Sequence, residues 1–149
     1  MQIPQKENTS RLSMEVLIDT NIVLDWFIKR EPFYETAKTL LSKCWFSNIR
    51  SYLTVHSICD LFYIIDKKFD TSEKKKLLQL LINRNDIISE SKSDIESFIK
   101  NENWTDLEDG LQMQSAKNYK LDYIITRNIS DFQDSSVPAI EPEAFLKLL

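Results

Sequence analysis

The sequence contains few of the residues on which several classes of site depend. Its 149 residues include one glycine, one histidine and two cysteines. The glycine, Gly110, lies in a helical pattern, so there is no glycine-rich loop for a nucleotide phosphate, which excludes Rossmann and P-loop chemistry. Cys44 and Cys59 lie in apolar stretches, where a free thiol behaves as a small hydrophobe, so neither a disulfide framework nor a zinc site is expected. The lone His56 cannot build a histidine-rich metal centre, and we expect it to be a partly exposed helix residue without a role.

The chain has no positive net charge and no long apolar run. The net charge is -4 and the pI about 5.1, so the chain does not hold nucleic acid by bulk electrostatics, and any such contact must be local. No stretch approaches the roughly 20 apolar residues of a membrane span, and the opening "MQIPQKENTS" lacks the apolar region of a signal peptide. We therefore expect a cytoplasmic protein that does not contact membranes.

Length and composition predict one globular domain. Apolar residues make up 42% and charged residues 28%, the balance of an ordinary globular protein. Residues 1–13 are polar and without periodicity, so we expect a tail followed by a single domain over 14–149. Two origins of the tail stay open: an appended segment, or an upstream start before a natural start at Met14.

The rest of the chain alternates between strand and helix patterns. Short β-branched segments predict strands at 14–19, 51–54, 86–89, 123–126 and 138–141. Helical patterns occupy 21–28, 32–46, 55–69, 72–84, 93–103, 107–119 and 143–149. Parallel strands need crossover connections that cover the sheet, so this alternation predicts an α/β fold: three α/β/α layers around a mainly parallel sheet of about five strands. In such sheets functional groups collect at the carboxyl ends of the strands.

Acidic residues follow the first strand and interrupt a later helix. Asp19 ends the first predicted strand, where a helix N-cap and a catalytic group explain it equally well. Asn21 either orients Asp19 or bonds to nearby backbone, and Asp25 is expected to be an exposed structural residue. Asp60 lies within a helix that is apolar nearly all round, where a carboxylate is costly unless it has a cation or donors. Ser57, on the same face, is placed to orient it.

The segment "TDLEDGL" supplies three acids in four positions. Thr105 and Glu108 fit a capping box, which gives Glu108 a structural explanation. Asp106 suits the first helical position, where a negative charge complements the helix dipole. Asp109 has neither explanation and is therefore the functional candidate of the three.

A last polar group follows the predicted strand in "LDYIITRNISDF". It contains Thr126, Arg127, Asn128 and Asp131, for which turn chemistry is the structural alternative. Four segments thus deliver acids or amides to strand ends or covered helices. Carboxylates about 4 Å apart repel by roughly 4 kcal/mol at an effective dielectric near 20, so a cluster of them must take up protons or bind a cation. Oxygen ligands favour Mg²⁺ or Mn²⁺.

Three blocks in this order resemble the PIN domain, the nuclease component of VapBC toxin-antitoxin modules. They are "VLIDTNIVLD", "LTVHSICDLFYII" and "DLEDGLQMQSAKNYKLDYIITRN", followed by "SDF", and the resemblance covers about residues 14–149. It implies a Mg²⁺- or Mn²⁺-dependent endoribonuclease that hydrolyses RNA phosphodiester bonds. The family's acids fall on Asp19, Asp60 and Asp109, which would be the catalytic metal ligands.

The resemblance also implies roles for the neighbouring residues. Asn21, Ser57 and Thr126 would fix the carboxylates, and Arg127 would bind phosphate. An RNA substrate, an antitoxin partner and a homodimer are implied as well.

Two positions depart from the family pattern. The family has Glu more often than the Asp found at position 60, and many members have a fourth acid where this chain has Asn128. One metal ion or a weaker second site is therefore expected, with Asn128 or Asp131 as further ligands.

Two other functions stay open at this point. One is a non-catalytic PIN-like module that binds RNA or protein through an eroded metal site. The other treats "DTNIV" as a degraded Asp-x-Asp-x-Thr phosphatase loop with Asp19 as nucleophile, although the second aspartate is missing.

Overall fold

The structure is a computed structural model that describes residues 13–65 and 68–149. Residues 1–12 of the predicted tail and residues 66–67 of the predicted helix 55–69 lie outside the described residues. Among the described residues, no helix has both the length and the apolar character needed to cross a membrane.

The described strands form one parallel sheet in the order β3-β2-β1-β4-β5. They are β1 (Met14–Ile18), β2 (Ile49–Thr54), β3 (Asp86–Ile88), β4 (Tyr123–Ile125) and β5 (Ala139–Ile140). Each overlaps a predicted strand, and the predicted five-stranded parallel sheet is confirmed. The central strand β1 is paired on both sides, with Leu17 opposite Tyr52 of β2 and Ile124 of β4.

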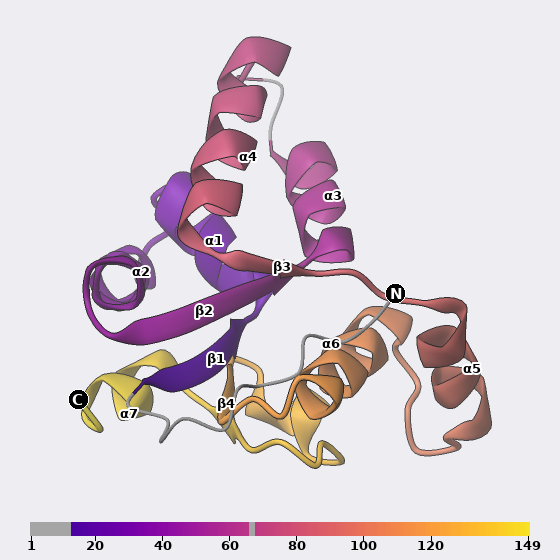
Figure 1. Ribbon diagram of the computed structural model, residues 1–149. Helices are drawn as coiled ribbons and strands as arrows, with labels where there is room; N and C mark the ends of the chain where they lie inside the picture. Colours follow the sequence, from indigo (N-terminus) through magenta and orange to yellow (C-terminus); the bar gives the residue numbers. More distant parts are fainter. Residues whose placement is uncertain (1–12, 66–67) are drawn as a thin grey trace.

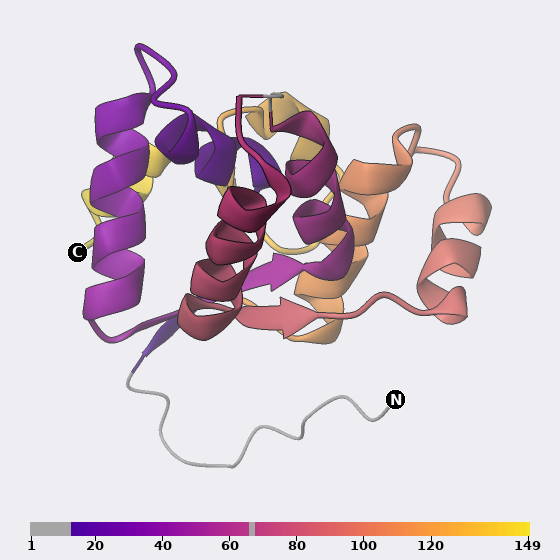
Figure 2. The same cartoon turned by 90° about the horizontal axis from the view of Figure 1, so that it is seen from above.

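Helices cover both faces of this sheet. They are α1 (Thr20–Phe27), α2 (Tyr34–Phe46), α3 (Val55–Ile64), α4 (Thr71–Arg84), α5 (Lys92–Lys100), α6 (Leu107–Asn118) and α7 (Pro142–Leu146), with a 3₁₀ turn η1 (Ile129–Phe132). Figure 1 shows α1, α3 and α4 above β2 and β3, α2 and α7 on the left of the sheet, and α5 and α6 to the right of β1. In the view from above, α5 lies at the outer edge of the molecule (Figure 2). The three-layer α/β/α prediction is confirmed.

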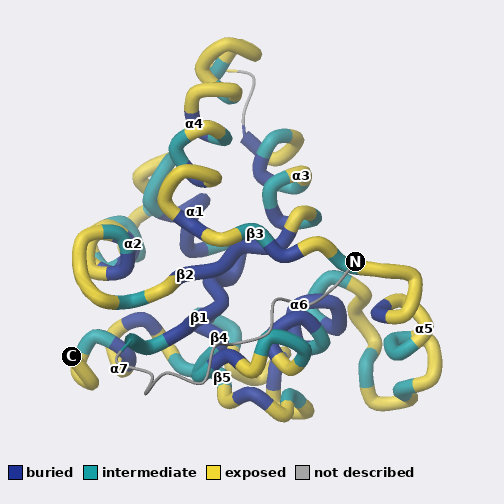
Figure 3. Tube along the Cα trace, viewed as in Figure 1, coloured by how far each residue is buried: buried dark blue, intermediate teal, exposed yellow. Residues whose placement is uncertain are grey.

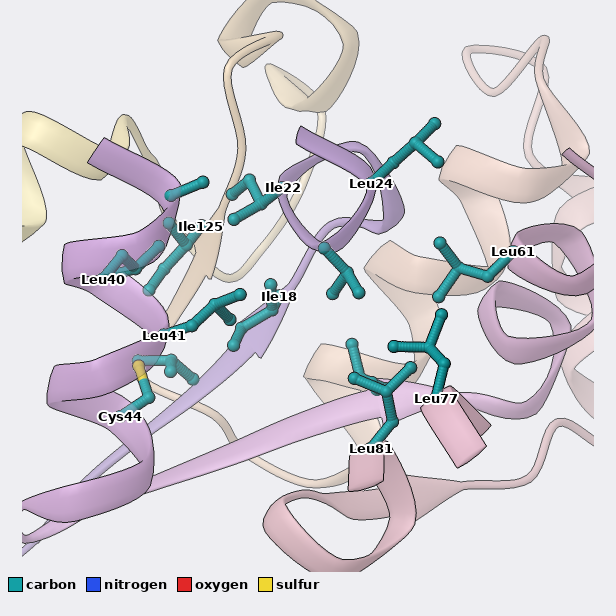
Figure 4. Close-up of a cluster of buried hydrophobic side chains, with 14 of the residues drawn as sticks. Ile18, Ile22, Leu24, Leu40, Leu41, Cys44, Leu61, Leu77, Leu81 and Ile125 are labelled. Carbon is teal, nitrogen blue, oxygen red and sulfur yellow. The ribbon is translucent and has the colours of Figure 1, made fainter. Parts of the chain in front are cut away.

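Alternation along the strands divides the core into two parts. Val16 and Ile18 of β1 pack with α1, α2, α3, α4 and α7, whereas Leu17 between them packs with α6 and η1. Burial on both faces explains why the strands read as nearly continuous apolar runs. The buried part of the chain follows the central strands in Figure 3, and Figure 4 shows the first cluster, with Ile18 and Ile125 facing Leu40 and Leu41 of α2.

Helix α3 is shorter and less covered than predicted. It ends at Ile64, because Ile65 turns into an extended conformation (φ -59°, ψ 123°) that buries its side chain in the core. Phe69, predicted as helical, instead packs against Phe27 with ring centroids 4.8 Å apart. Tyr63 is 82% exposed, so the expectation of a helix covered nearly all round is wrong.

The strand order reverses next to β1. The chain runs from β1 outward through β2 to β3, then returns to the other side of β1 as β4 and β5. The carboxyl ends of β1 and β4 therefore lie side by side at the switch point, where open α/β sheets place their functional groups. The Asp19 N–H donates to the Ile125 carbonyl at 3.0 Å, which sets Asp19 directly beside Thr126.

Candidate metal centre

Asp19 is buried at the end of β1 and held by neutral donors. Thr126 Oγ1 donates to its Oδ2 at 2.9 Å, and Gln112 Nε2 donates to its Oδ1 at 3.4 Å. It occupies the N-cap position of α1, yet it makes no side-chain capping hydrogen bond. Burial raises the pKa of Asp19 above its ordinary value, while the hydrogen bonds from Thr126 and Gln112 oppose that rise. The contacts are those of a positioned carboxylate more than of a helix cap.

Thr126 and Asn128 form the adjoining turn after β4. The Thr126 side chain is fully buried, and its Oγ1 also accepts the Asn128 N–H at 3.0 Å. That hydrogen bond fixes the hydroxyl so that its proton points to Asp19. Asn128 is the N-cap of η1, a 3₁₀ helix where the sequence indicated only a polar loop or turn, and η1 carries the exposed Asp131.

Asp60 of α3 meets two further ionisable side chains. Each of His56, Asp60 and Glu108 offers an atom able to bind a metal ion, and these atoms lie within 4.8 Å of one another. Burial, then hydrogen bonding to Asp60 and its charge, raises the pKa of Glu108 to about 7. Two carboxylates in contact cannot both stay ionised without a cation, so this contact must hold a proton or a metal ion.

Glu108 was assigned to the wrong role by sequence reasoning. Helix α6 begins at Leu107, and its N-cap is Asp106, whose side chain accepts the Asp109 N–H at 2.9 Å. The predicted capping box of Thr105 and Glu108 is therefore wrong, and so is the placement of Asp106 at the first helical position. Both Thr and Asp cap helices well. The helix begins at Leu107, the first residue of the predicted range 107–119, so the error lies in the choice of Thr105 as the cap. Glu108 is thereby free to face α3, which no pattern within its own segment indicates.

Ser57 reaches the site through Thr20. Thr20 Oγ1 lies 2.7 Å from Ser57 Oγ and 3.5 Å from Glu108 Oε1. Ser57 Oγ also lies 2.9 Å from Oγ1 of Thr54, the N-cap of α3. The hydrogen bonds of Ser57 thus lead through Thr20 towards Glu108, whereas its predicted task of orienting Asp60 stays a prediction.

Asp109 lies on the Asp19 side of the site. Burial and then the charges of Asp106, Asp19 and Asp131 raise the pKa of Asp109 to about 7. Asp19, Asp109 and Asp131 therefore share one negative region beside the ends of β1 and β4. Of the predicted acids, the structure places Asp60 against Glu108 and His56, whereas Asp19 and Asp109 influence each other through their charges and are not part of that close group. Their shared role as metal ligands stays a prediction.

Asp25 does not belong to this group. It is 1% exposed, and Arg127 donates to it from Nε at 2.7 Å and from Nη2 at 3.2 Å. Arg30 Nη1 is 3.4 Å away. The predicted exposed position of Asp25 is wrong, because the chain folds a bidentate guanidinium onto it. The Arg127 guanidinium also lies 3.8 Å from the centroid of the Phe33 ring, and phosphate binding by Arg127 stays a prediction.

The donor set fits a hard divalent cation. Asp60 of α3 meets Glu108 of α6, and the pKa values of Glu108 and the neighbouring Asp109 are near 7. Mg²⁺ and Mn²⁺ prefer oxygen ligands of this kind. Such an ion would add positive charge where Asp60 and Glu108 have only the imidazole of His56 beside them.

The family follows from the sequence itself. A family model described as "PIN domain" matches residues 15–130. The chain belongs to the PIN domain family, whose members are generally nucleases. No curated protein matches the sequence.

Solved structures of toxin-antitoxin proteins share the fold. A toxin-antitoxin complex from Klebsiella pneumoniae is 23% identical with a TM-score of 0.64, over 85% of this chain and 97% of that one. VapBC-1 from nontypeable Haemophilus influenzae is 15% identical (TM-score 0.63, 87% and 99% covered). VapBC2 from Rickettsia felis, bound to a DNA fragment from its promoter, is 16% identical (TM-score 0.60, 86% and 98% covered). At these identities the likeness concerns the fold.

Proposed function

We propose that the protein is a Mg²⁺- or Mn²⁺-dependent endoribonuclease that hydrolyses RNA phosphodiester bonds. The observation that carries the proposal is the contact of Asp60 with Glu108 and His56, whose candidate ligand atoms lie within 4.8 Å of one another. The negative charge of Asp19 acts on both Glu108 and Asp109 at the same edge of the sheet. Membership of a family of nucleases supports the same chemistry.

Each side chain has a task in this proposal. Asp19, Asp60 and Asp109, joined by Glu108, would hold the ion, and Asn128 and Asp131 would be its further ligands. The ion, when bound, polarises an attacking water and offsets charge that develops on the phosphate. Thr126 and Gln112 fix both oxygens of Asp19, so one carboxylate is oriented before any ion or RNA arrives.

The biological setting is proposed from the structural neighbours. The Klebsiella pneumoniae neighbour is described as a toxin-antitoxin complex, which supports the proposal of a toxin masked by a protein antitoxin. From the family resemblance we further propose that it acts in the cytoplasm and forms a homodimer. With a net charge of -4, the contact with RNA would be confined to the metal centre and its rim.

The test is cleavage of end-labelled RNA by the purified chain in Mn²⁺. Asp19→Asn and Asp109→Asn should each abolish cleavage, because each removes an anionic ligand with little change of shape. Asp134→Asn, an exposed acid outside the site, is the matched control and should cleave at the wild-type rate. Cleavage that survives both ligand substitutions would overturn the proposal. Failure to bind Mn²⁺ at millimolar concentration would instead favour a non-catalytic binding module.

A further inference from the structure

His56 faces the two acids from a favourable position on α3. It precedes Asp60 by four residues, so the two side chains share one helix face, opposite Glu108 of α6. Their candidate ligand atoms lie within 4.8 Å of one another. Ligands of one ion with bonds near 2.1 Å are about 3–4 Å apart, so small side-chain rotations would bring these three atoms around an ion.

The two ring nitrogens of His56 have different surroundings. Nδ1 is hydrogen-bonded to Glu90 Oε1. Nε2 is buried and has no hydrogen-bond partner within the described part of the chain. A carboxylate that accepts from Nδ1–H fixes the tautomer in which Nε2 carries the free lone pair. Histidines that bind metal ions generally have their second nitrogen bound in this way, which orients the ring and increases the basicity of the ligand.

A bound ion accounts for these features together. It would give the buried Nε2 a partner and would separate the negative charges of Asp60 and Glu108. Mg²⁺ favours an all-oxygen octahedral shell, whereas imidazole suits transition-metal ions. A nitrogen ligand from His56 would therefore favour a transition-metal ion such as Mn²⁺ over Mg²⁺.

We propose that His56 binds, through Nε2, the divalent ion held by Asp60 and Glu108, and that this nitrogen makes the site select Mn²⁺ over Mg²⁺. The inference rests on the metal centre of the proposed function and names a ligand that the sequence pattern did not indicate. Glu90 acts through His56 as a positioning residue.

The alternative explanation, in which His56 is only a cation, predicts the opposite change in metal affinity when His56 is removed. If His56 serves only as a cation that neutralises the acids, its removal leaves more negative charge and tighter binding of every divalent ion. If it is a ligand, its removal weakens Mn²⁺ and Co²⁺ selectively. A comparison of ions therefore separates the two explanations without any measurement of catalysis.

The experiment titrates the metal-free full chain with Mn²⁺, Mg²⁺ and Co²⁺ by calorimetry and follows Co²⁺ by its visible absorption. His56→Gln should weaken Mn²⁺ and Co²⁺ binding by about tenfold or more and change the Co²⁺ spectrum, while Mg²⁺ affinity changes by less than about threefold. Glu90→Gln should weaken Mn²⁺ binding by about tenfold through loss of ring orientation. Circular dichroism verifies folding, and His56→Asn serves as the second variant if His56→Gln does not fold.

Other outcomes separate this inference from the proposed function. If His56→Gln leaves the ratio of Mn²⁺ affinity to Mg²⁺ affinity unchanged, or binds both ions more tightly, the ligand role of His56 is overturned. If Asp60→Asn still abolishes Mn²⁺ binding and RNA cleavage in that case, the nuclease proposal stands without the nitrogen ligand. If Asp19→Asn and Asp60→Asn both leave Mn²⁺ binding intact, the metal centre itself is refuted, and this inference with it.

Discussion

Asp25 and the Asp60–Glu108 pair show two treatments of negative charge on helices near the carboxyl edge of the sheet. Asp25 of α1 is 1% exposed and receives a bidentate guanidinium from Arg127, with Arg30 close by. Asp60 of α3 instead meets Glu108, and burial together with that contact raises the pKa of Glu108 to about 7. Asp25, to which the chain supplies the guanidinium of Arg127, is a structural residue. Asp60 and Glu108, which contact each other, form the place where an external cation fits.

Asp19 lies between these two cases. It is 5% exposed, like a structural acid, but its partners Thr126 and Gln112 are neutral. Neutral donors orient a carboxylate and stabilise its charge without cancelling it. Its charge therefore remains available to a metal ion.

The largest expected effect is on the Asp25 side of the comparison. Arg127→Ala should destabilise the protein by about 3 kcal/mol in urea unfolding, because it leaves a buried carboxylate without its main partner. Lys92→Ala is the matched control, since Lys92 is 91% exposed in its pair with Glu96 and should cost less than about 1 kcal/mol. Equal losses in the two variants would show that the Asp25 contact is not the structural ion pair described above.

The sequence predicted the fold and the strand-end acid for clear physical reasons. Alternating β-branched and helical segments leave few topologies other than a parallel sheet, and Asp19 follows directly from the end of a buried strand. The side chains that contact these acids could not be predicted from the sequence. Arg127 is 102 residues from Asp25, and Glu108 meets Asp60 from another helix. These contacts depend on how helices pack in three dimensions, which periodicity within one segment does not determine.

The second prediction concerns pH. The pKa values of Glu108 and Asp109 in the folded protein are about 7, above the ordinary 4.5 and 3.8, so the folded state holds protons that the unfolded state has released. The contribution of these two groups to the stability of the metal-free protein should therefore be largest below about pH 4 and should be lost as pH rises through 7. Glu108→Gln should be more stable than wild type at pH 8 by about 1 kcal/mol, a figure reduced for solvent screening of this half-exposed group.

Urea unfolding of both proteins between pH 5 and 8, in chelator, measures this difference. Saturating Mn²⁺ should remove the decline in wild type, because the ion replaces the proton between the carboxylates. If wild-type stability instead rises from pH 5 to 8 in parallel with Glu108→Gln, the acids are not crowded in the way that separates them from Asp25.

The smallest effect decides whether Glu108 belongs to the acidic pair alone or also caps its helix. Asp106 accepts the Asp109 N–H at 2.9 Å as N-cap of α6, whereas Thr105 lies one residue outside the helix. Asp106→Ala should cost about 1 kcal/mol, while Thr105→Ala should change the free energy of unfolding by less than about 0.5 kcal/mol. Measured at pH 8 in Mn²⁺, the two variants differ mainly in the cap. A larger cost for Thr105→Ala would restore the capping box, and Glu108 would then have a structural role like that of Asp25.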